Sequence, residues 1–324
     1  MKINVYLLIL TLLSSASLMA QPLILQPTIS PDGTNIAFSY QGDIWTVPAV
    51  GGRADRLTLH EAYETNPKWS ADGKSIAFQS DRYGNNDVFL MEAGGSIPTR
   101  LTFHASSDEL TDFTTGGELV FTTRRLYAQV EREREIHKVA INGGTPTLLI
   151  DALGLEPAVS PDGSKVAFVR GTCRTAREAY QGPANRDVWM YDMNTGEYTQ
   201  LTDYNGNDFN PHWKDNNTLL YLTSESGRYN IHELPLGGEA TQLTSEENFG
   251  INSFSVSDNG TIVYQLADQV KMLGSATEAT TLSINVSSDL RFDQEVAKTI
   301  SNGLEEYAVS PNGKYSAYIT HGEV

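Results

Sequence analysis

Two arginine-rich segments contain the residues best suited to binding a ligand. A guanidinium group binds a carboxylate through two parallel hydrogen bonds, and basic clusters in an acidic chain attract anionic groups. The first segment contains Arg124, Arg125, Arg132 and Arg134, interleaved with Glu131, Glu133 and Glu135. The second contains Arg170, Arg174, Arg177 and Arg186, opposed only by Glu178. We expect acidic or C-terminal carboxylate groups of peptides to bind here, with these candidate contacts: Arg124, Arg125, Arg174, Arg177 and Arg186.

A structural alternative exists for both segments. Runs of charged residues are usually solvated faces of a protein. Arg132 and Arg134 would then pair with their neighbouring glutamates, and the second segment would pack on the next domain. The sequence alone leaves both interpretations open.

No catalytic or metal-binding motif accompanies the arginines. The chain has no Gly-x-Ser-x-Gly elbow and no phosphate-binding Gly-x-x-x-x-Gly-Lys loop. His60-Glu61 lacks the second histidine of a zinc site. The stretch from Asp203 resembles the start of a calcium loop, but Asp208 replaces its turn glycine and Lys214 its bidentate acid. We expect no catalytic residue, no cofactor and no metal site in this chain.

Composition narrows the function classes further. The 324 residues are 40% hydrophobic and 19% charged, which suits a globular chain with a sizeable core. The formal net charge of −17 argues against a nucleic-acid partner, since phosphate contacts need a basic surface. Cys173 is the only cysteine, so there is no intrachain disulfide framework.

Residues 1–20 have the layout of a secretory signal peptide. Lys2 precedes an apolar run over residues 5–13, and small residues lead to Ala20. A membrane anchor is the alternative, but spanning a bilayer takes about 20 apolar residues. We expect an exported, periplasmic protein with no membrane span after signal removal, or a cytoplasmic one if the leader is not cleaved.

Three short tags recur in the same order after residue 26. The first is a turn before an apolar triplet, as in Ser30–Gly33 before Ile36–Phe38, Ser70–Gly73 before Ile76–Phe78, and Ser160–Gly163 before Val166–Phe168. The second is a polar, a β-branched and usually an aromatic residue, as in Asp43-Ile44-Trp45 and Asp87-Val88-Phe89. The third centres on a leucine followed, in most copies, by threonine: Leu57, Leu101, Leu148, Leu201, Leu243 and Leu282. These leucines lie 39 to 53 residues apart, which gives six complete units.

Each unit predicts four short antiparallel strands. Ser-Pro-Asp-Gly closes a hairpin, because proline presets φ, aspartate bonds back to the backbone and glycine accepts positive φ. The apolar triplets suit buried strands. A period of about 40–50 residues with four strands is typical of a β-propeller. We predict an all-β fold: a six-bladed β-propeller of four-stranded antiparallel blades over residues 21–284.

Other conspicuous residues sit at repeat positions. His60 and His104 follow the third tag in adjacent units, and the four tryptophans also recur in register: Trp45, Trp69, Trp189 and Trp213. Equivalent positions in repeats more often pack or form turns than bind ligands. We expect structural roles for all six.

The repeat restarts near the C-terminus. Ser310–Gly313 followed by Ser316–Tyr318 copies the first tag, and Gly322–Val324 begins the second. We expect residues 285–302 to be a connector and residues 303–324 the incomplete first blade of a second propeller. A seven-bladed ring closed by strands from both ends is the alternative.

These repeats resemble a known family. Ser80–Phe89 with Arg100–Thr102 looks like the repeat of TolB-type and prolyl-oligopeptidase-type propellers. The fuller similarity is to bacterial homologues of tricorn protease, through Ile29–Gly33, Gly42–Pro48, Gly182–Trp189, Val286–Asp289 and Tyr307–Gly313. The resemblance implies a signal-like leader, a six-bladed and then a seven-bladed propeller, and protease domains flanking a PDZ domain. It covers residues 22–324 but at most a third of such a protease, and the serine nucleophile of the family lies outside them.

Two functions therefore remain. The first is a substrate-gating, peptide-filtering propeller of an exported tricorn-like serine peptidase, with peptides or unfolded segments as ligands and protease domains downstream in cis. The second is a stand-alone TolB-like propeller that binds a periplasmic protein and has no enzymatic activity. Both are compatible with a homo-oligomer.

Overall fold

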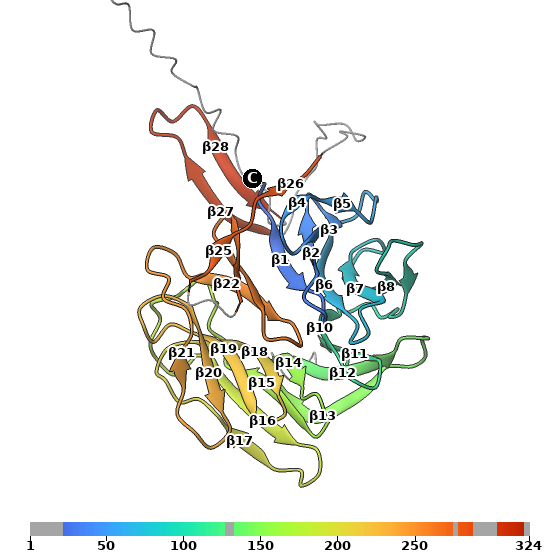
Figure 1. The fold of residues 1–324 in the computed structure, drawn as a ribbon, viewed down its shortest axis with the longest axis vertical. Helices are drawn as coiled ribbons and strands as arrows, with labels where there is room; N and C mark the ends of the chain where they lie inside the picture. Colours follow the sequence, from blue (N-terminus) through green and yellow to red (C-terminus); the bar gives the residue numbers. More distant parts are fainter. Residues whose placement is uncertain (1–21, 127–132, 275–277, 288–302, 321–324) are drawn as a thin grey trace, which may run out of the picture.

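The described part of this computed structural model comprises residues 22–126, 133–274, 278–287 and 303–320, and it contains strands and turns but no α-helix. Six four-stranded antiparallel sheets follow one another along the chain. Figure 1 shows them arranged as blades in chain order, from blue to orange. The predicted six-bladed β-propeller is confirmed.

Each blade contributes one strand to each of four positions. The innermost strands are β1 (Leu25–Ile29), β6 (Glu64–Trp69), β10 (Glu109–Phe113), β14 (Leu155–Val159), β18 (Asp208–Asp215) and β22 (Ile251–Val256). The second strands are β2 (Asn35–Tyr40), β7 (Ser75–Ser80), β11 (Glu118–Thr123), β15 (Lys165–Arg170), β19 (Thr218–Thr223) and β23 (Ile262–Leu266). The third strands are β3 (Asp43–Pro48), β8 (Asp87–Glu92), β12 (Glu135–Ala140), β16 (Asp187–Asp192), β20 (Asn230–Pro235) and β24 (Gln269–Leu273). The outermost strands are β5 (Asp55–Arg56), β9 (Thr99–Arg100), β13 (Thr147–Leu153), β17 (Tyr198–Gln200), β21 (Thr241–Gln242) and β25 (Thr280–Thr281).

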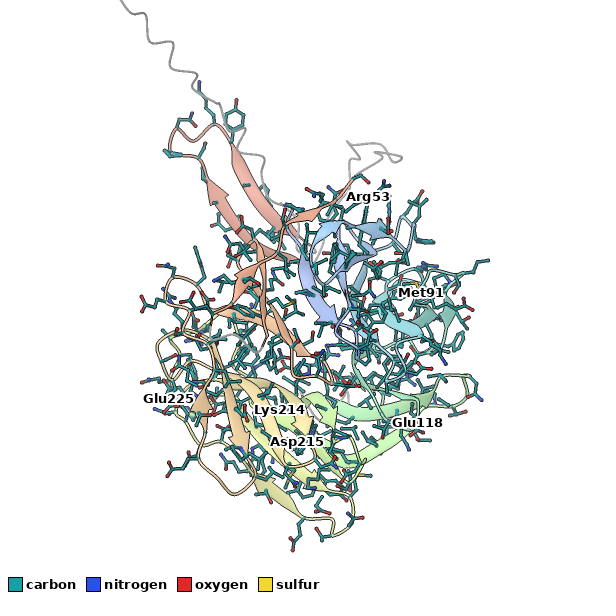
Figure 2. All side chains as sticks on the ribbon, viewed as in Figure 1. Arg53, Met91, Glu118, Lys214, Asp215 and Glu225 are labelled. Atoms are coloured by element: carbon teal, nitrogen blue, oxygen red, sulfur yellow. The ribbon has the colours of Figure 1, made fainter. Side chains whose placement is uncertain are left out.

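The hydrophobic core lies between blades. Every innermost strand contacts the innermost strands of both neighbouring blades, and β22 contacts β1, so the six form a closed ring. Six apolar clusters occupy the six blade interfaces. Between blades one and two, for example, Ile44 packs with Phe78 and Met91, which is labelled in Figure 2. Because one face of a blade is buried by the next, stability comes from the ring as a whole.

The sequence tags fold as local hydrogen-bonded units. Ser30 Oγ donates to Asp32 Oδ1 at 2.6 Å, Thr34 N donates to the same oxygen at 3.0 Å, and Gly33 takes φ +75°. The threonine of the third tag closes the blade, because Thr58 Oγ1 accepts a hydrogen bond from Ile44 N at 2.9 Å. The same bond recurs at 2.9 Å in blades two, four and five, through Thr102, Thr202 and Thr244.

An acid–arginine pair joins the second and third tags in the first two blades. Asp43 pairs with Arg56, and Asp87 pairs with Arg100 at 2.7 Å. Both arginines also donate to the backbone carbonyl of the tag threonine. In blade four Gln200 takes the place of the arginine. Its side chain donates to the Thr202 carbonyl at 2.9 Å, but a neutral amide gives Asp187 no cationic partner.

Among the described residues, each four-stranded blade is built from strands that follow one another in the chain, and the first and last blades are joined by packing and by a short added strand. An apolar cluster joins them, and Ile29 N donates to Ser255 Oγ at 2.8 Å. The chain leaving blade six then forms β26 (Ile284–Asn285), which pairs in parallel with β4 (Gly52–Arg53) at the edge of blade one. This two-residue clip adds the backbone bond from Gly52 N to Ser283 O at 2.8 Å.

A separate hairpin follows the blades. β27 (Leu304–Val309) pairs with β28 (Ser316–Thr320), and Figure 1 shows the pair (red) projecting from the ring. Ser310 Oγ donates to Asn312 Oδ1 at 2.8 Å, which repeats the turn of the first blade. The predicted signal peptide and residues 288–302 of the predicted connector lie outside the described residues. Within the described ranges no helix could cross a membrane.

The repeat residues have the expected structural roles. His60 Nδ1 and His104 Nδ1 each accept a hydrogen bond at 2.9 Å from the backbone two residues on, in an exposed turn. Trp45 and Trp213 belong to the core, while Trp69 and Trp189 pack partly buried against it.

Candidate functional site: the central channel

The innermost strands line a central channel with a repeated kink. Four blades carry a polar residue before proline at the same place in the strand: Gln26-Pro27, Asn66-Pro67, Glu156-Pro157 and Asn210-Pro211. Each polar residue has φ between 51° and 55° and lies where the strand register shifts. Proline is tolerated because the inner edge of the blade has no partner strand. The bulge turns the polar side chains out of the blade, and left-handed backbone at non-glycine residues often marks functional sites.

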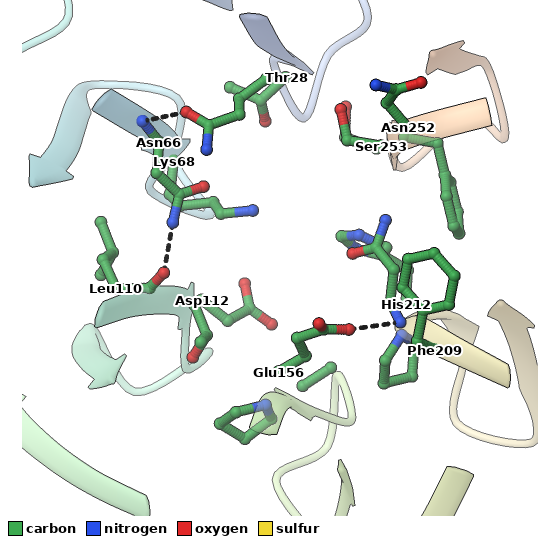
Figure 3. Close-up of a pocket in the computed structure, with 18 of the residues that line it drawn as sticks. Thr28, Asn66, Lys68, Leu110, Asp112, Glu156, Phe209, His212, Asn252 and Ser253 are labelled. Carbon is green, nitrogen blue, oxygen red and sulfur yellow. Dashed lines mark hydrogen bonds between the residues drawn. The ribbon is translucent and has the colours of Figure 1, made fainter. Parts of the chain in front are cut away.

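Some of these side chains join neighbouring blades. Asn66 N donates to Gln26 Oε1 at 2.8 Å, and Asn66 Nδ2 donates to the Leu110 carbonyl. Asn210 N donates to Glu156 Oε2 at 2.7 Å, as the dashed lines of Figure 3 show. The kinked residues are therefore held in place by the adjacent blades.

The channel contains two adjoining spaces, a larger one at its mouth and a smaller inner cavity. The mouth encloses about 620 Å³ and lies where the innermost strands begin, near Tyr63, Asp81 and Arg134. The inner cavity encloses about 250 Å³ and is lined by residues further along the same strands. Five residues border both spaces, and we call them the collar: Gln26, Asn66, Leu110, Thr111 and Glu156.

Opposite charges face the inner cavity. Lys68 projects from β6, and Asp112 lies on the neighbouring β10 (Figure 3). Burial lowers the pKa of Lys68, while the carboxylates of Asp112 and Glu156 oppose that change. Burial also raises the pKa of Asp112 to about 6, despite the attraction of the Lys68 ammonium.

A neutral histidine lies on another wall. His212 comes from β18 in blade five, which faces blade two across a six-bladed ring. Burial lowers its pKa to about 3, and the Lys68 charge acts in the same direction. Its ring packs edge-on against Phe254, with 4.7 Å between ring centres. The cavity thus combines an amine, a carboxyl group and an imidazole that burial keeps uncharged.

One predicted arginine contact reaches the channel mouth. Arg186 lines the mouth, where its Nη1 pairs with Glu156 at 2.8 Å and its Nε donates to the Cys173 carbonyl at 2.7 Å. Arg134 lines the same mouth and pairs with Glu109 at 3.4 Å.

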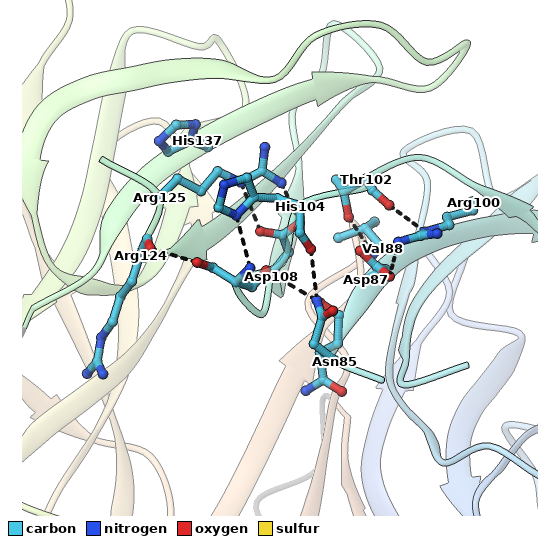
Figure 4. Close-up of polar contacts among 12 residues, drawn as sticks. Asn85, Asp87, Val88, Arg100, Thr102, His104, Asp108, Arg124, Arg125 and His137 are labelled. Carbon is cyan, nitrogen blue, oxygen red and sulfur yellow. Dashed lines mark hydrogen bonds and ion pairs between the residues drawn. The ribbon is translucent and has the colours of Figure 1, made fainter. Parts of the chain in front are cut away.

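Arg124 and Arg125 belong to blade three. The Arg125 guanidinium pairs with Asp108, whose side chain is fully buried (Figure 4). This pair repeats the one between Arg82 and Glu64 in blade two. Arg124 is exposed, and its carbonyl accepts a hydrogen bond from Ser106 Oγ at 2.8 Å. Arg125 therefore holds blade three together, whereas the Arg124 side chain faces solvent.

The blade-four insertion, residues 171–186, packs on blade five. Glu178 pairs with Arg228 at 2.8 Å, and Tyr229 Oη donates to the Thr175 carbonyl at 2.9 Å. Thr175 also lines the inner cavity. Arg174 and Arg177 flank Thr175 in the chain, and both are exposed. The guanidinium carbon of Arg177 lies 4.6 Å from the centre of the Tyr180 ring. The insertion thus reaches the inner cavity through Thr175, whereas Arg174 and Arg177 line neither the cavity nor the mouth.

Sequence reasoning missed the channel residues. Lys68, Asp112 and His212 belong to no motif, but the polar residue before proline recurs in four repeats and could have revealed the lining. The stretch from Asp203 does not form an ion loop: Asn207 donates to Tyr229 Oη at 3.0 Å, and Asp208 is buried in blade five. Over the described ranges no group of three or more acidic, histidine or cysteine residues is placed to hold a metal.

Comparison with known proteins establishes the family. The family model described as the tricorn protease N-terminal beta propeller domain matches residues 21–279. The chain belongs to this tricorn propeller family. Tricorn protease homolog 1 of Streptomyces coelicolor is 24% identical over 244 residues, which are 74% of this chain and 22% of that protein. The Tol-Pal system protein TolB of Francisella tularensis is 22% identical over 249 residues, 74% of this chain and 52% of TolB.

The solved structures agree on the fold. The crystal structure of the tricorn protease superposes with a TM-score of 0.71 at 15% identity, and covers 90% of this chain and 28% of that one. This tricorn-type propeller therefore spans about a quarter of the tricorn proteins it matches and about half of TolB.

Proposed function

We propose that this tricorn-type propeller filters peptides for an exported serine peptidase whose catalytic domains lie outside the 324 residues. The observation that carries the proposal is a polar channel, built on the innermost strands, with an arginine-bearing insertion beside it. Family membership supports the peptidase context.

The geometry suggests how peptides would be selected. Arg174 and Arg177 are exposed on the insertion whose Thr175 lines the inner cavity, so they would attract acidic or C-terminal carboxylate groups from solution. The collar is held rigid by inter-blade hydrogen bonds, so it would admit extended chains and exclude folded domains. Arg186, already paired with Glu156, would set the charge of the mouth.

The chain ends fit the same proposal. Residues 1–20 would direct export, residues 285–302 would connect two propellers, and the β27–β28 hairpin would start the second one. Tyr307 and Tyr315 on this hairpin are 70% and 74% exposed, as expected of strands that further strands would cover.

The size of the native protein tests the peptidase context. An antibody raised against residues 27–284 should detect a band far above 35.6 kDa in the extracytoplasmic fraction of the source cells. Peptidase activity should co-purify with that band and be blocked by a serine-directed inhibitor. A band at or below 35.6 kDa would contradict the proposal.

Arginine variants test peptide capture. The double variant Arg174→Ala/Arg177→Ala should weaken binding of a fluorescent acidic peptide by about 10-fold at low salt, and added salt should shrink the difference. Fluorescence anisotropy measures both. Arg53→Ala is the matched control, because Arg53 is exposed on β4 at the edge of blade one (Figure 2). Equal losses in both variants would show a general charge effect.

Similarity to TolB favours a second candidate. A stand-alone propeller that binds a periplasmic protein would also use an exposed face of the ring. It predicts a small native protein, no co-purifying peptidase activity, and capture of one protein partner in place of peptides.

A further inference from the structure

A cleft lies at the end of the ring opposite the channel mouth. It encloses about 460 Å³ and is formed where the innermost strands of blades one, two and six end and turn, by residues between 30 and 35, between 69 and 73, and by 258–259. The innermost strands begin at the mouth and run toward these turns. The cleft shares no lining residue with the two channel spaces, so it is a separate surface of the molecule.

Hydrogen bonds between blades hold the turns of this cleft in place. Asp258 N donates to the Pro31 carbonyl at 2.9 Å, which joins the turns of blades six and one. Trp69 of blade two reaches across to blade one, where its indole N–H donates to the Thr28 carbonyl at 3.1 Å. Because the cleft is already formed, a ligand would pay little for ordering it.

One wall of the cleft is aromatic. The Trp69 side chain is only partly buried and lines the cleft together with Pro31. In blade five the equivalent Trp213 is 9% exposed, and the bond from Asp162 N to Asn216 Oδ1 at 2.9 Å joins the turns of blades four and five directly. Across the described chain no such bond joins residues 30–33 to residues 70–73, and the Trp69 indole borders open space.

Three carboxylates border the same cleft. Asp32, Asp72 and Asp258 are exposed, and each belongs to a different blade. None of the residues that line the cleft is a lysine or an arginine. The formal net charge of −17 adds a long-range attraction for basic partners. The cleft is therefore complementary in charge to a cation.

The three carboxylates differ in their capacity to bind. Asp258 has no ion pair and no side-chain hydrogen bond within the described chain. Asp72 Oδ1 accepts from Ser70 Oγ in its own turn, whereas Oδ2 has only the exposed Lys74 ammonium at 3.7 Å. Hydrogen bonds within its turn, first from Ser30, lower the pKa of Asp32, so this carboxylate is ionised and contributes charge. Asp258 and Asp72 thus supply the free acceptor atoms.

We propose that this cleft binds an arginine side chain of a partner protein. The guanidinium would stack on the Trp69 indole and pair with the Asp258 and Asp72 carboxylates. A guanidinium suits the site better than an ammonium, because it is planar, stacks on aromatic rings and donates to two acceptors at once. Free arginine suits it less, since the aspartates would repel its α-carboxylate. This inference concerns a protein partner and goes beyond the proposed peptide channel.

NMR of the full chain with isotope-labelled tryptophan tests the proposal. The capped peptide acetyl-Gly-Arg-Gly-amide should shift the Trp69 indole signal in a saturable way, and loss of that signal in Trp69→Phe assigns it. Citrulline in place of the arginine keeps the shape without the charge and should weaken binding by about 10-fold or more. Asp258→Asn and Asp72→Asn should each weaken binding of the arginine peptide by about 3-fold or more.

A matched variant and the peptide series keep the outcomes separable. Asp162→Asn should leave binding unchanged, because Asp162 occupies the same turn position in blade four, away from the cleft. The citrulline and lysine peptides are measured on the unaltered chain, so a variant that fails to fold does not remove the test. The inference is overturned if the Trp69 signal does not shift, or if the arginine peptide binds no more tightly than the citrulline or lysine peptide. Each of these results leaves the channel proposal standing, because acidic-peptide binding through Arg174 and Arg177 is measured separately.

Discussion

Replacing Asp208 with asparagine should remove a pH-dependent cost of folding in blade five. Asp208 is the first residue of β18 and is 1% exposed. Burial raises its pKa to about 7, although hydrogen bonds from Thr223 and Thr202 oppose the change, and the charges of Asp187 and Glu225 raise it further. In blade two the equivalent Glu64 pairs with Arg82, but Glu225 takes the place of that arginine in blade five.

The magnitude follows from the pKa. A rise from 3.8 to about 7 corresponds to about 4 kcal/mol of difference between the two protonation states. Between these values the folded chain keeps a proton that the unfolded chain has lost. The cost of burying Asp208 is therefore absent below about pH 4, because the carboxyl group is protonated in both states. It grows as the pH rises and is complete above about pH 7.

Urea unfolding at several pH values measures this contribution. Relative to the unaltered chain, Asp208→Asn should gain about 4 kcal/mol in free energy of unfolding between about pH 4 and about pH 8. The hydroxyls of Thr202 and Thr223 can accept from the new amide. Asp268→Asn, in an exposed turn, should show no such gain. The reasoning is refuted if the two proteins have parallel pH profiles, or if Asp208→Asn is the less stable at pH 8.

Three further substitutions test the blade and ring contacts by urea unfolding. Gln200→Arg should give Asp187 the arginine partner that the equivalent aspartates of blades one and two have, and should raise the free energy of unfolding by about 1 kcal/mol at pH 8. No gain would show that the new arginine does not pair with Asp187. Thr58→Val leaves a buried β3 backbone N–H unpaired and should cost about 1–3 kcal/mol, whereas a neutral result would contradict that bond. Gly51→Ala should cost about 1 kcal/mol or more, because φ is +82° and the new Cβ would approach Ser283 O to 2.7 Å; unchanged stability would argue against the β4–β26 clip.

The blades were predictable because their signals are local and repeated. A turn such as Ser30–Gly33 fixes its own hydrogen bonds within five residues, so its copies predict hairpins wherever they occur. The role of the tag threonine was not predicted, since Thr58 acts on a residue 14 positions away. Its repetition in four blades nevertheless explains why the tag is regular.

The site was less predictable because it depends on contacts between blades. The sequence marked Arg125 as a ligand contact, but its partner Asp108 is recognisable only once the strand register is known. Lys68, Asp112 and His212 meet because three blades converge on one axis, and nothing near each residue signals the others. The clip by β26 also joins segments more than 200 residues apart, beyond the reach of any local pattern.

Hydrogen–deuterium exchange of the full chain with and without peptide tests most directly that the channel is the ligand site. With an acidic peptide present, slowed exchange should appear in segments around the collar and inner cavity and in residues 171–186. The outermost strands and the β27–β28 hairpin should exchange as before. Protection confined to the outer strands or to the hairpin would contradict a channel that binds peptides.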